Sequence, residues 1–262
     1  MKNVEFDDMR KSKKYDIGLR SGKGSRKYQQ DAGYIAVNDN ELVAVICDGM
    51  GGLNGGQEAS HTAVEAFIEF YQYYAKSMEG NDYEWRLDVI HQIDDIIYSL
   101  KDADNRRIGA GTTLISAIIN DNRLYWLSVG DSRMYIIRRD EIVPITNDHN
   151  YHYILRERLN NKQISYETYQ KELIRGEALV SFLGMGGLEM IDINDKAFVL
   201  QSGDIVLICT DGLYRCINEN VIKEVLNSSK DMQEAADYIE DLIKKRGLIH
   251  QDNYTYVLIK QR

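Results

Sequence analysis

Aspartate residues at the ends of apolar segments are the side chains of this sequence best placed to do chemistry. The apolar residues 43–47 lead directly to Asp48, and three glycines follow at Gly49, Gly51 and Gly52. A carboxylate at the end of a buried strand is costly unless a cation meets it, and a hard metal ion is the simplest such partner. An Asp-Gly hairpin turn explains the same residues, so this segment alone leaves both interpretations open.

The same pattern recurs along the chain. A second apolar segment, residues 205–209, ends in Thr-Asp-Gly, and other aspartates stand beside further expected strands. The aspartates of this kind are Asp31, Asp131, Asp211 and Asp252. Carboxylates that converge repel one another and need cations between them, and oxygen ligands without a His or Cys cluster favour Mg²⁺ or Mn²⁺ over Zn²⁺. Unrelated turns, each containing a common turn residue, are the alternative.

The elements that must position these aspartates predict an α+β fold. Apolar runs predict strands at residues 15–19, 33–37, 43–47, 112–119, 124–129, 134–137, 142–145, 197–200, 204–209 and 254–259. Apolar residues at three- and four-residue intervals predict helices at 57–75, 83–101, 219–226 and 232–246. Strands and helices are segregated rather than alternating, which excludes a parallel sheet of βαβ units.

Two regions of this pattern carry more specific predictions. The four strands between residues 112 and 145 are joined by tight turns, so we expect an antiparallel meander. Residues 150–180 are rich in charge and tyrosine and predict two short polar helices, 153–160 and 165–174. We interpret residues 150–180 as a flap-like insertion over one edge of the sheet.

Composition sets limits on the class of protein. The 262 residues are 44% hydrophobic and contain one proline and no linker, which favours a single domain over residues 1–262. The net charge of −9 argues against a nucleic-acid role. With no secretory signal and no membrane-length apolar run, a cytoplasmic location is expected. Cys47, Cys209 and Cys216 lack metal-ligand spacing, so we expect buried free thiols.

Seven short motifs contain or flank the aspartates. They are Arg26-x-x-x-Gln30-Asp31, Asp48-Gly-Met-Gly-Gly52, Gly111-Thr-Thr113, Gly130-Asp-Ser-Arg133, Thr146-x-Asp148-His149, Thr210-Asp211-Gly212 and Asp252-Asn253-x-Thr255. Together they resemble the motif series of the metal-dependent type 2C (PPM) serine/threonine protein phosphatases, and Met50 resembles the bacterial branch. The resemblance covers about residues 15–260. It implies a four-layer αββα sandwich of two antiparallel sheets flanked by helix pairs.

The resemblance also implies metal ligands. Asp48 would bridge two Mn²⁺ or Mg²⁺ ions, and the carbonyl of Gly49 would bind one of them. Asp211 and Asp252 would complete the set of ligands around the second ion. Asp131 matches the position that helps to bind a third, weaker ion in bacterial relatives. The implied reaction is hydrolysis without a covalent phosphoenzyme, in which two metals share a water, lower its pKa and direct it at phosphorus.

Further residues receive roles from the same resemblance. Arg26 matches the arginine that receives the substrate phosphate, although it could be only part of a solvated basic loop. Asp31 would support the metals through their water shell, and His149 fits a structural position better than a catalytic one. Some relatives carry a histidine that protonates the leaving group, where this chain has Met50, so a metal-bound water would have to supply that proton.

These features predict a phosphoserine/phosphothreonine protein phosphatase that opposes a serine/threonine kinase of the same cell, with that kinase and its substrates as partners. Two other classes stay open. A degenerate relative would bind phosphoproteins without turnover, and a metallo-phosphoesterase of another kind would act on a small molecule. The predicted flap is the most divergent part of the chain, so the resemblance does not identify the target.

Overall fold

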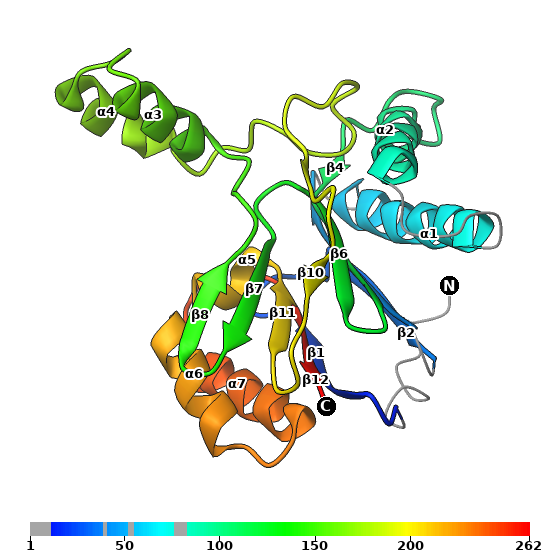
Figure 1. The fold of residues 1–262 in the computed structure, drawn as a ribbon. Coiled ribbons are helices and arrows are strands. Elements are labelled where there is room, and N and C mark those ends of the chain that lie inside the picture. Colours follow the sequence, from blue (N-terminus) through cyan, green and yellow to red (C-terminus); the bar gives the residue numbers. More distant parts are fainter. Residues whose placement is uncertain (1–11, 39–40, 52–54, 76–82) are drawn as a thin grey trace.

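A computed structural model describes residues 12–38, 41–51, 55–75 and 83–262. Two antiparallel sheets lie face to face, and a pair of helices covers the outer face of each (Figure 1). The predicted α+β class and the four-layer arrangement are therefore confirmed. Within the described residues, no helix is both long enough and apolar enough to cross a membrane.

The two sheets are built from strands distant in sequence. In spatial order, the first sheet contains β1 (Tyr15–Gly22), β12 (Tyr254–Gln261), β11 (Ile205–Cys209), β7 (Arg133–Arg138) and β8 (Glu141–Pro144). The second contains β10 (Phe198–Val199), β6 (Arg123–Val129), β5 (Leu114–Asn120), β3 (Glu41–Met50) and β2 (Asp31–Val37), with β4 (Gly111–Thr112) beside β3 and β9 (Asp192–Ile193) beside β6.

The helices fall into two covering pairs and a separate group. The pairs are α1 (Gly55–Ala75) with α2 (Tyr83–Tyr98) on the second sheet, and α6 (Glu219–Ser228) with α7 (Met232–Arg246) on the first. The others are α3 (Tyr151–Asn160), α4 (Tyr166–Glu172), the 3₁₀ turn η2 (Leu173–Arg175) and the single turn α5 (Asp211–Tyr214).

Alternating burial explains why the central strands read as continuous apolar runs. In β3, Val43, Val45 and Cys47 pack under α1 and α2, whereas Leu42 and Ile46 pack between the two sheets. Successive side chains of a strand point to opposite faces, so a strand covered on both faces must be apolar at every position. Strands β7, β11 and β12 divide their side chains in the same way between the inter-sheet layer and the layer under α6 and α7.

The predicted four-strand meander is wrong. Strands β5 and β6 pair in the second sheet, but β7 and β8 pair in the first, and β7 lies between β8 and β11. The chain crosses from one sheet to the other at Gly130, whose φ of 105° lies in the region that favours glycine. A tight turn signal does not distinguish a hairpin from a crossing between sheets, because both need the same backbone freedom.

The predicted end of the strand before Asp48 is also wrong. Strand β3 continues through Asp48 and Gly49 to Met50, and β4 pairs with this extension through the register Gly49 to Thr112. The sequence pattern ended the strand at Cys47, before Asp48. Gly52, the last residue of that motif, lies outside the described residues.

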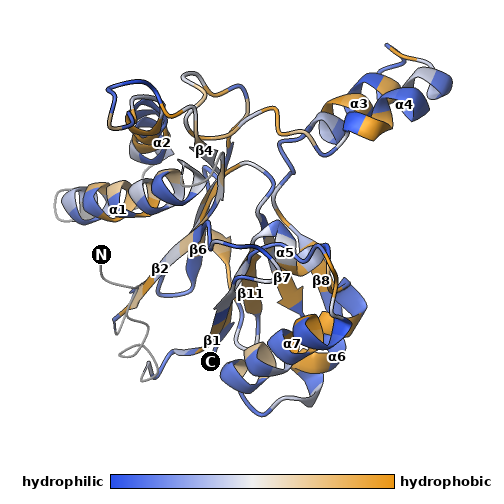
Figure 2. Cartoon of the chain, turned by 180° about the vertical axis from the view of Figure 1, so that it is seen from behind, coloured by the Kyte–Doolittle hydropathy of each residue, from blue (hydrophilic) through white to orange (hydrophobic). Residues whose placement is uncertain are grey.

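The predicted polar helices of residues 150–180 are confirmed as α3 and α4, followed by η2. They form a hairpin that extends away from the four layers instead of lying over an edge of a sheet (Figure 1), and apolar and polar residues are interspersed along its helices (Figure 2). Leu155 is the buried residue of α3, and α4 has none. We call residues 150–180 the flap, and its base lies next to the crossing at Gly130.

Gly49 permits a close approach between β3 and α1. A Cβ at this position would stand 2.0 Å from the carbonyl oxygen of Gly56 in the first turn of α1 and 2.6 Å from that of Gln30. Both obstructing atoms belong to the backbone, so relief would require α1 or the loop before β2 to move.

We expect Gly49→Ala to lower the free energy of unfolding by about 3 kcal/mol, because overpacking against backbone forces such a shift. Urea denaturation of the metal-free protein measures the change. A variant as stable as the wild type would show that α1 can recede from β3 without cost.

Candidate metal centre

Strand pairing gathers the predicted aspartates at one end of both sheets. Asp31 and Asp48 are direct partners on β2 and β3. In the other sheet, β11 ends just before Asp211, and its antiparallel neighbour β12 begins just after Asp252. The end of one antiparallel strand lies beside the start of the next, so residues separated by tens of positions become neighbours.

Two threonines hold the backbone of Asp48. The hydroxyl of Thr112 donates to the carbonyl oxygen of Asp48 at 2.9 Å. The amide of Asp48 donates to the hydroxyl of Thr113 at 2.9 Å, and Thr113 in turn meets Ser132 Oγ at 2.8 Å. Through Ser132, these hydroxyls connect Asp48 to the crossing between the sheets.

Asp31 joins the two sheets at the site. It is only 3% exposed, and its Oδ2 accepts a hydrogen bond of 3.0 Å from the hydroxyl of Thr210, which directly precedes Asp211. A second link runs alongside, because the amide of Gln30 donates to the side-chain oxygen of Asn253 at 2.8 Å. Each pair joins the start of β2 in the second sheet to a residue next to β11 or β12 in the first, so these bonds fix the sheets relative to one another at the rim.

Arg26 lies at the exposed side of the site. Its guanidinium contacts Asp252 at 2.5 Å, and the two side chains are 54% and 36% exposed. The loop that carries Arg26 is attached to the loop before β12, since Ser25 donates its amide to the carbonyl of Gln251 at 2.9 Å. The predicted phosphate-binding arginine is thus next to a predicted metal ligand and open to solvent.

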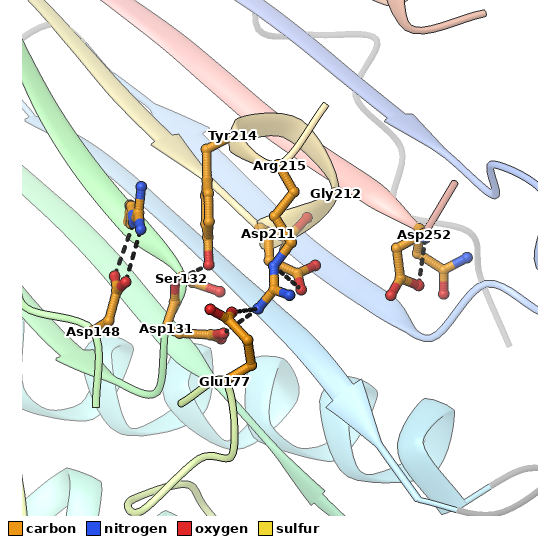
Figure 3. Close-up of polar contacts among 12 residues, drawn as sticks. Asp131, Ser132, Asp148, Glu177, Asp211, Gly212, Tyr214, Arg215 and Asp252 are labelled. Atoms are coloured by element: carbon orange, nitrogen blue, oxygen red, sulfur yellow. Dashed lines mark hydrogen bonds and ion pairs between the residues drawn. The ribbon is translucent and has the colours of Figure 1, made fainter. Parts of the chain in front are cut away.

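Asp131 lies on the opposite side, at the crossing between β6 and β7. It is 5% exposed, and its carbonyl oxygen accepts a hydrogen bond of 3.1 Å from the hydroxyl of Tyr214 (Figure 3). The ring of Tyr214 lies 3.7 Å from the guanidinium carbon of Arg133, whose nitrogens form two bonds to Asp148, at 2.8 and 2.7 Å. Asp148 therefore pairs with an arginine instead of facing the other carboxylates.

His149 has a structural position, in agreement with the sequence interpretation. It is 1% exposed, and its Nδ1 accepts a hydrogen bond of 3.1 Å from the amide of Gly130. Burial lowers its pKa, which favours the neutral ring that can accept this bond. The amide of His149 also donates to the carbonyl of Gly130 at 2.9 Å, so the flap begins from a residue tied to the crossing.

Sequence reasoning missed Arg215. Its Nε lies 3.0 Å from Asp211, and one terminal nitrogen lies 3.4 Å from Asp131 and 2.6 Å from Glu177 of the flap (Figure 3). Its position four residues after Asp211, across the single turn α5, was the available signal. That turn was not predicted, because four residues carry no periodicity.

Burial and mutual repulsion dominate the electrostatics of the site. Burial raises the pKa of Asp31 to about 7 and that of Asp131 to about 6. Burial also raises the pKa of Asp48 well above its ordinary value, and Asp31, Asp211, Asp131 and Asp252 all add to the rise. The pKa of Asp211 is raised by burial and partly restored by Arg215. Four carboxylates thus act on Asp48, and the protein supplies too few cations to balance them.

The donor set fits hard divalent cations. Asp31 Oδ1 and Asp211 Oδ1 are buried without a hydrogen-bond partner, which is costly for a charged oxygen and is relieved by a cation. Within the described ranges, no three carboxylate, His or Cys side chains converge closely enough to hold one ion by themselves. Backbone carbonyls and water must therefore complete each shell, and Mg²⁺ in particular keeps several waters in protein sites.

The chain is similar in sequence to known proteins. The family model described as protein phosphatase 2C matches residues 21–248. The serine/threonine phosphatase stp of Listeria monocytogenes serotype 4b is 27% identical over 238 residues, which cover 90% of this chain and 91% of the relative.

Solved structures share the fold. The serine/threonine phosphatase of S. agalactiae superposes with a TM-score of 0.77 at 24% identity and covers 95% of this chain and 100% of its own. The catalytic domain of the phosphatase PstP, solved in complex with two manganese ions, superposes with a TM-score of 0.70 at 24% identity and covers 94% of this chain and 98% of its own.

The raised pKa values predict how the metal-free protein responds to pH. A carboxyl group whose pKa is raised on folding stabilises the fold fully only below its unfolded-state pKa, and this contribution is lost as the pH rises through the folded-state pKa. For Asp31 this interval runs from about 4 to about 7. We therefore expect the melting temperature of the metal-free protein to fall by several degrees across it, and Mn²⁺ to cancel the fall.

Thermal unfolding between pH 4 and pH 8, with a chelator or with Mn²⁺, measures the effect. Asp31→Asn removes the titrating group and should show a shallower fall. An equal fall in this variant would mean that Asp31 does not contribute to the pH dependence.

Proposed function

The chain belongs to the protein phosphatase 2C family, and we propose that it hydrolyses phosphoserine and phosphothreonine in proteins with water activated between two Mn²⁺ or Mg²⁺ ions. It is a metal-dependent serine/threonine protein phosphatase. One observation carries the mechanism: aspartates from both sheets converge at one rim, where burial and mutual repulsion leave their carboxylates in need of cations.

The proposed ligands follow from this geometry. Asp48 is central, because every other aspartate of the cluster raises its pKa. It would therefore bridge the two ions, and the carbonyl of Gly49 would bind one of them. Asp211 and Asp252, at the ends of adjacent strands, would hold the second ion. Asp131 lies on the other side of the site, where Arg215 already contacts its carboxylate.

The ions, when bound, would supply an activated water and positive charge against the phosphoryl oxygens. The chain contributes the remaining parts. Arg26 is exposed enough to meet the incoming phosphate, and its planar fork suits two phosphoryl oxygens. Asp31, held by Thr210, would accept hydrogen bonds from water within the site. Met50 has no exchangeable proton, so water must protonate the leaving serine or threonine oxygen.

The proposed partners are phosphorylated proteins, among them a serine/threonine kinase of the same cell and its substrates. The relative stp, named as a serine/threonine phosphatase, supports this substrate class. We also propose a cytoplasmic location, as expected from the sequence. The flap stands beside the Asp131 side of the site, so it is the part of the chain best placed to contact the protein around the phosphorylated residue.

We expect Asp48→Asn and Asp211→Asn to reduce Mn²⁺-dependent phosphopeptide hydrolysis by at least about a thousandfold, because each removes a proposed metal ligand. Asp121→Asn is the matched control: this carboxylate is 68% exposed, pairs with Lys14 and lies outside the site, so full activity is expected. Circular dichroism checks that the folds are equal.

The same assay distinguishes the other functional classes when a panel of phosphopeptides, nucleotides and sugar phosphates is supplied with Mn²⁺. Turnover concentrated on phosphoserine and phosphothreonine peptides supports the proposal. Metal binding without turnover would indicate a phosphoprotein-binding module, and preference for a small molecule would indicate a different phosphoesterase.

Arg26→Ala tests the proposed phosphate contact. We expect KM for a phosphopeptide to rise about tenfold, with a smaller change in kcat, because a charge-assisted bond to the substrate is lost. Lys27→Ala removes the same charge from the same loop and should change KM less than about twofold. Equal effects of the two variants would mean that Arg26 contributes only positive charge and makes no specific contact with the phosphate.

A further inference from the structure

Arg215 connects three carboxylates that come from three separate segments. Asp211 begins α5, Asp131 lies at the crossing between the sheets, and Glu177 belongs to the flap (Figure 3). The contacts are 3.0 Å from Nε to Asp211, 3.4 Å to Asp131 and 2.6 Å to Glu177. The last two share one nitrogen of the guanidinium.

Local structure holds the arginine in this place. Its amide donates to the carbonyl of Asp211 at 3.0 Å, which closes the turn of α5 and directs the side chain back over that residue. The preceding residue, Tyr214, is fixed by its bond to the carbonyl of Asp131 and by the guanidinium of Arg133. Arg215 therefore extends from a rigid turn.

The charges at this point explain what the guanidinium does. The side chains of Asp131 and Asp211 are 8% and 15% exposed, whereas Glu177 is 68% exposed. Two largely buried negative charges require a cation, and a planar guanidinium can meet several carboxylates at once. On this side of the site, the guanidinium of Arg215 provides the positive charge that a metal ion would otherwise provide.

We infer that Arg215 is a positioning residue that stands in for a metal ion between Asp131 and Asp211 and anchors the flap to the site through Glu177. The inference deepens the proposed function, since it concerns the same site. The enzyme then has two metal positions. At the third position, which the family resemblance implied at Asp131, Arg215 takes the place of the metal ion.

The flap contact adds a second consequence. Backbone bonds already close the flap base, with the amide of Tyr151 donating to the carbonyl of Ala178 and that of His152 to Gly176, each at 2.8 Å. Glu177 lies between these two acceptors, so its side chain leaves a fixed base. The Glu177–Arg215 pair thus couples the position of the flap to the cation that lies beside Asp131.

The first test counts Mn²⁺ per chain by equilibrium dialysis followed by metal analysis. We expect Arg215→Gln to bind one more Mn²⁺ than the wild type, because the vacated carboxylates regain a metal position. Arg215→Lys retains a cation and should keep the wild-type number. The control is Arg106→Gln, which removes an arginine that is 78% exposed and pairs with Asp104. Equal numbers in wild type and Arg215→Gln would overturn the inference.

The second test measures the flap directly and does not depend on turnover. Trypsin cleavage after Arg175, followed by mass spectrometry, should be about threefold faster in Glu177→Gln than in the wild type, because a partly exposed ion pair contributes modestly to closure. Glu167→Gln breaks an ion pair with Lys171 elsewhere in the flap and should leave the rate unchanged. No acceleration in Glu177→Gln would overturn the anchoring role, even if Arg215→Gln fails to fold.

These outcomes separate this inference from the proposed function. A wild-type protein that binds no Mn²⁺ would contradict both. Normal Mn²⁺ binding with an unchanged number in Arg215→Gln would contradict the role of Arg215 alone.

Discussion

Repulsion among buried carboxylates is the constraint on which the rest of this structure depends. Burial raises the pKa of Asp48 well above its ordinary value, and the neighbouring carboxylates of Asp31, Asp131, Asp211 and Asp252 raise it further. A fold tolerates such a cluster only if the backbone beneath it is rigid and cations reach it from outside. The rigidity comes from sheet registers and threonine hydroxyls. Two arginines, Arg26 and Arg215, supply part of the positive charge, and the proposed metal ions would supply the rest.

The site belongs to neither sheet alone. Thr210 bonds to Asp31, and Gln30 bonds to Asn253, across the boundary between the sheets. The third connection, from Thr113 to Ser132, lies where the chain passes from one sheet to the other. Burial of the apolar faces brings the sheets together without fixing their relative position, because hydrophobic contact is non-directional. The hydrogen bonds at the rim are directional and fix the position of one sheet relative to the other.

Those parts of the fold and site that depend on local pattern could be predicted from the sequence. Continuous apolar runs such as residues 205–209 indicated strands covered on both faces. The aspartates beside such runs lie close enough together to act on Asp48. Pairing between distant segments left no such pattern in the sequence. The β6–β7 passage between sheets uses the same Gly-Asp signal as a hairpin, and β3 continues past Asp48 only because β4 pairs with it. Arg215 was missed because the single turn that places it over Asp211 carries no periodicity, and because Asp131 and Glu177 lie beside it only after folding.

The apolar layer between the sheets has an effect beyond stability. Ile46 of β3 and Ile208 of β11 belong to this layer, and each lies within three residues of a site aspartate. Packed sheets stand about 10 Å apart, a spacing set by the volumes of the side chains between them. Changes of side-chain volume here therefore alter the separation of Asp48 and Asp211. A conservative exchange in this layer would therefore change the dimensions of the reaction centre, and with them turnover, even where the protein still folds.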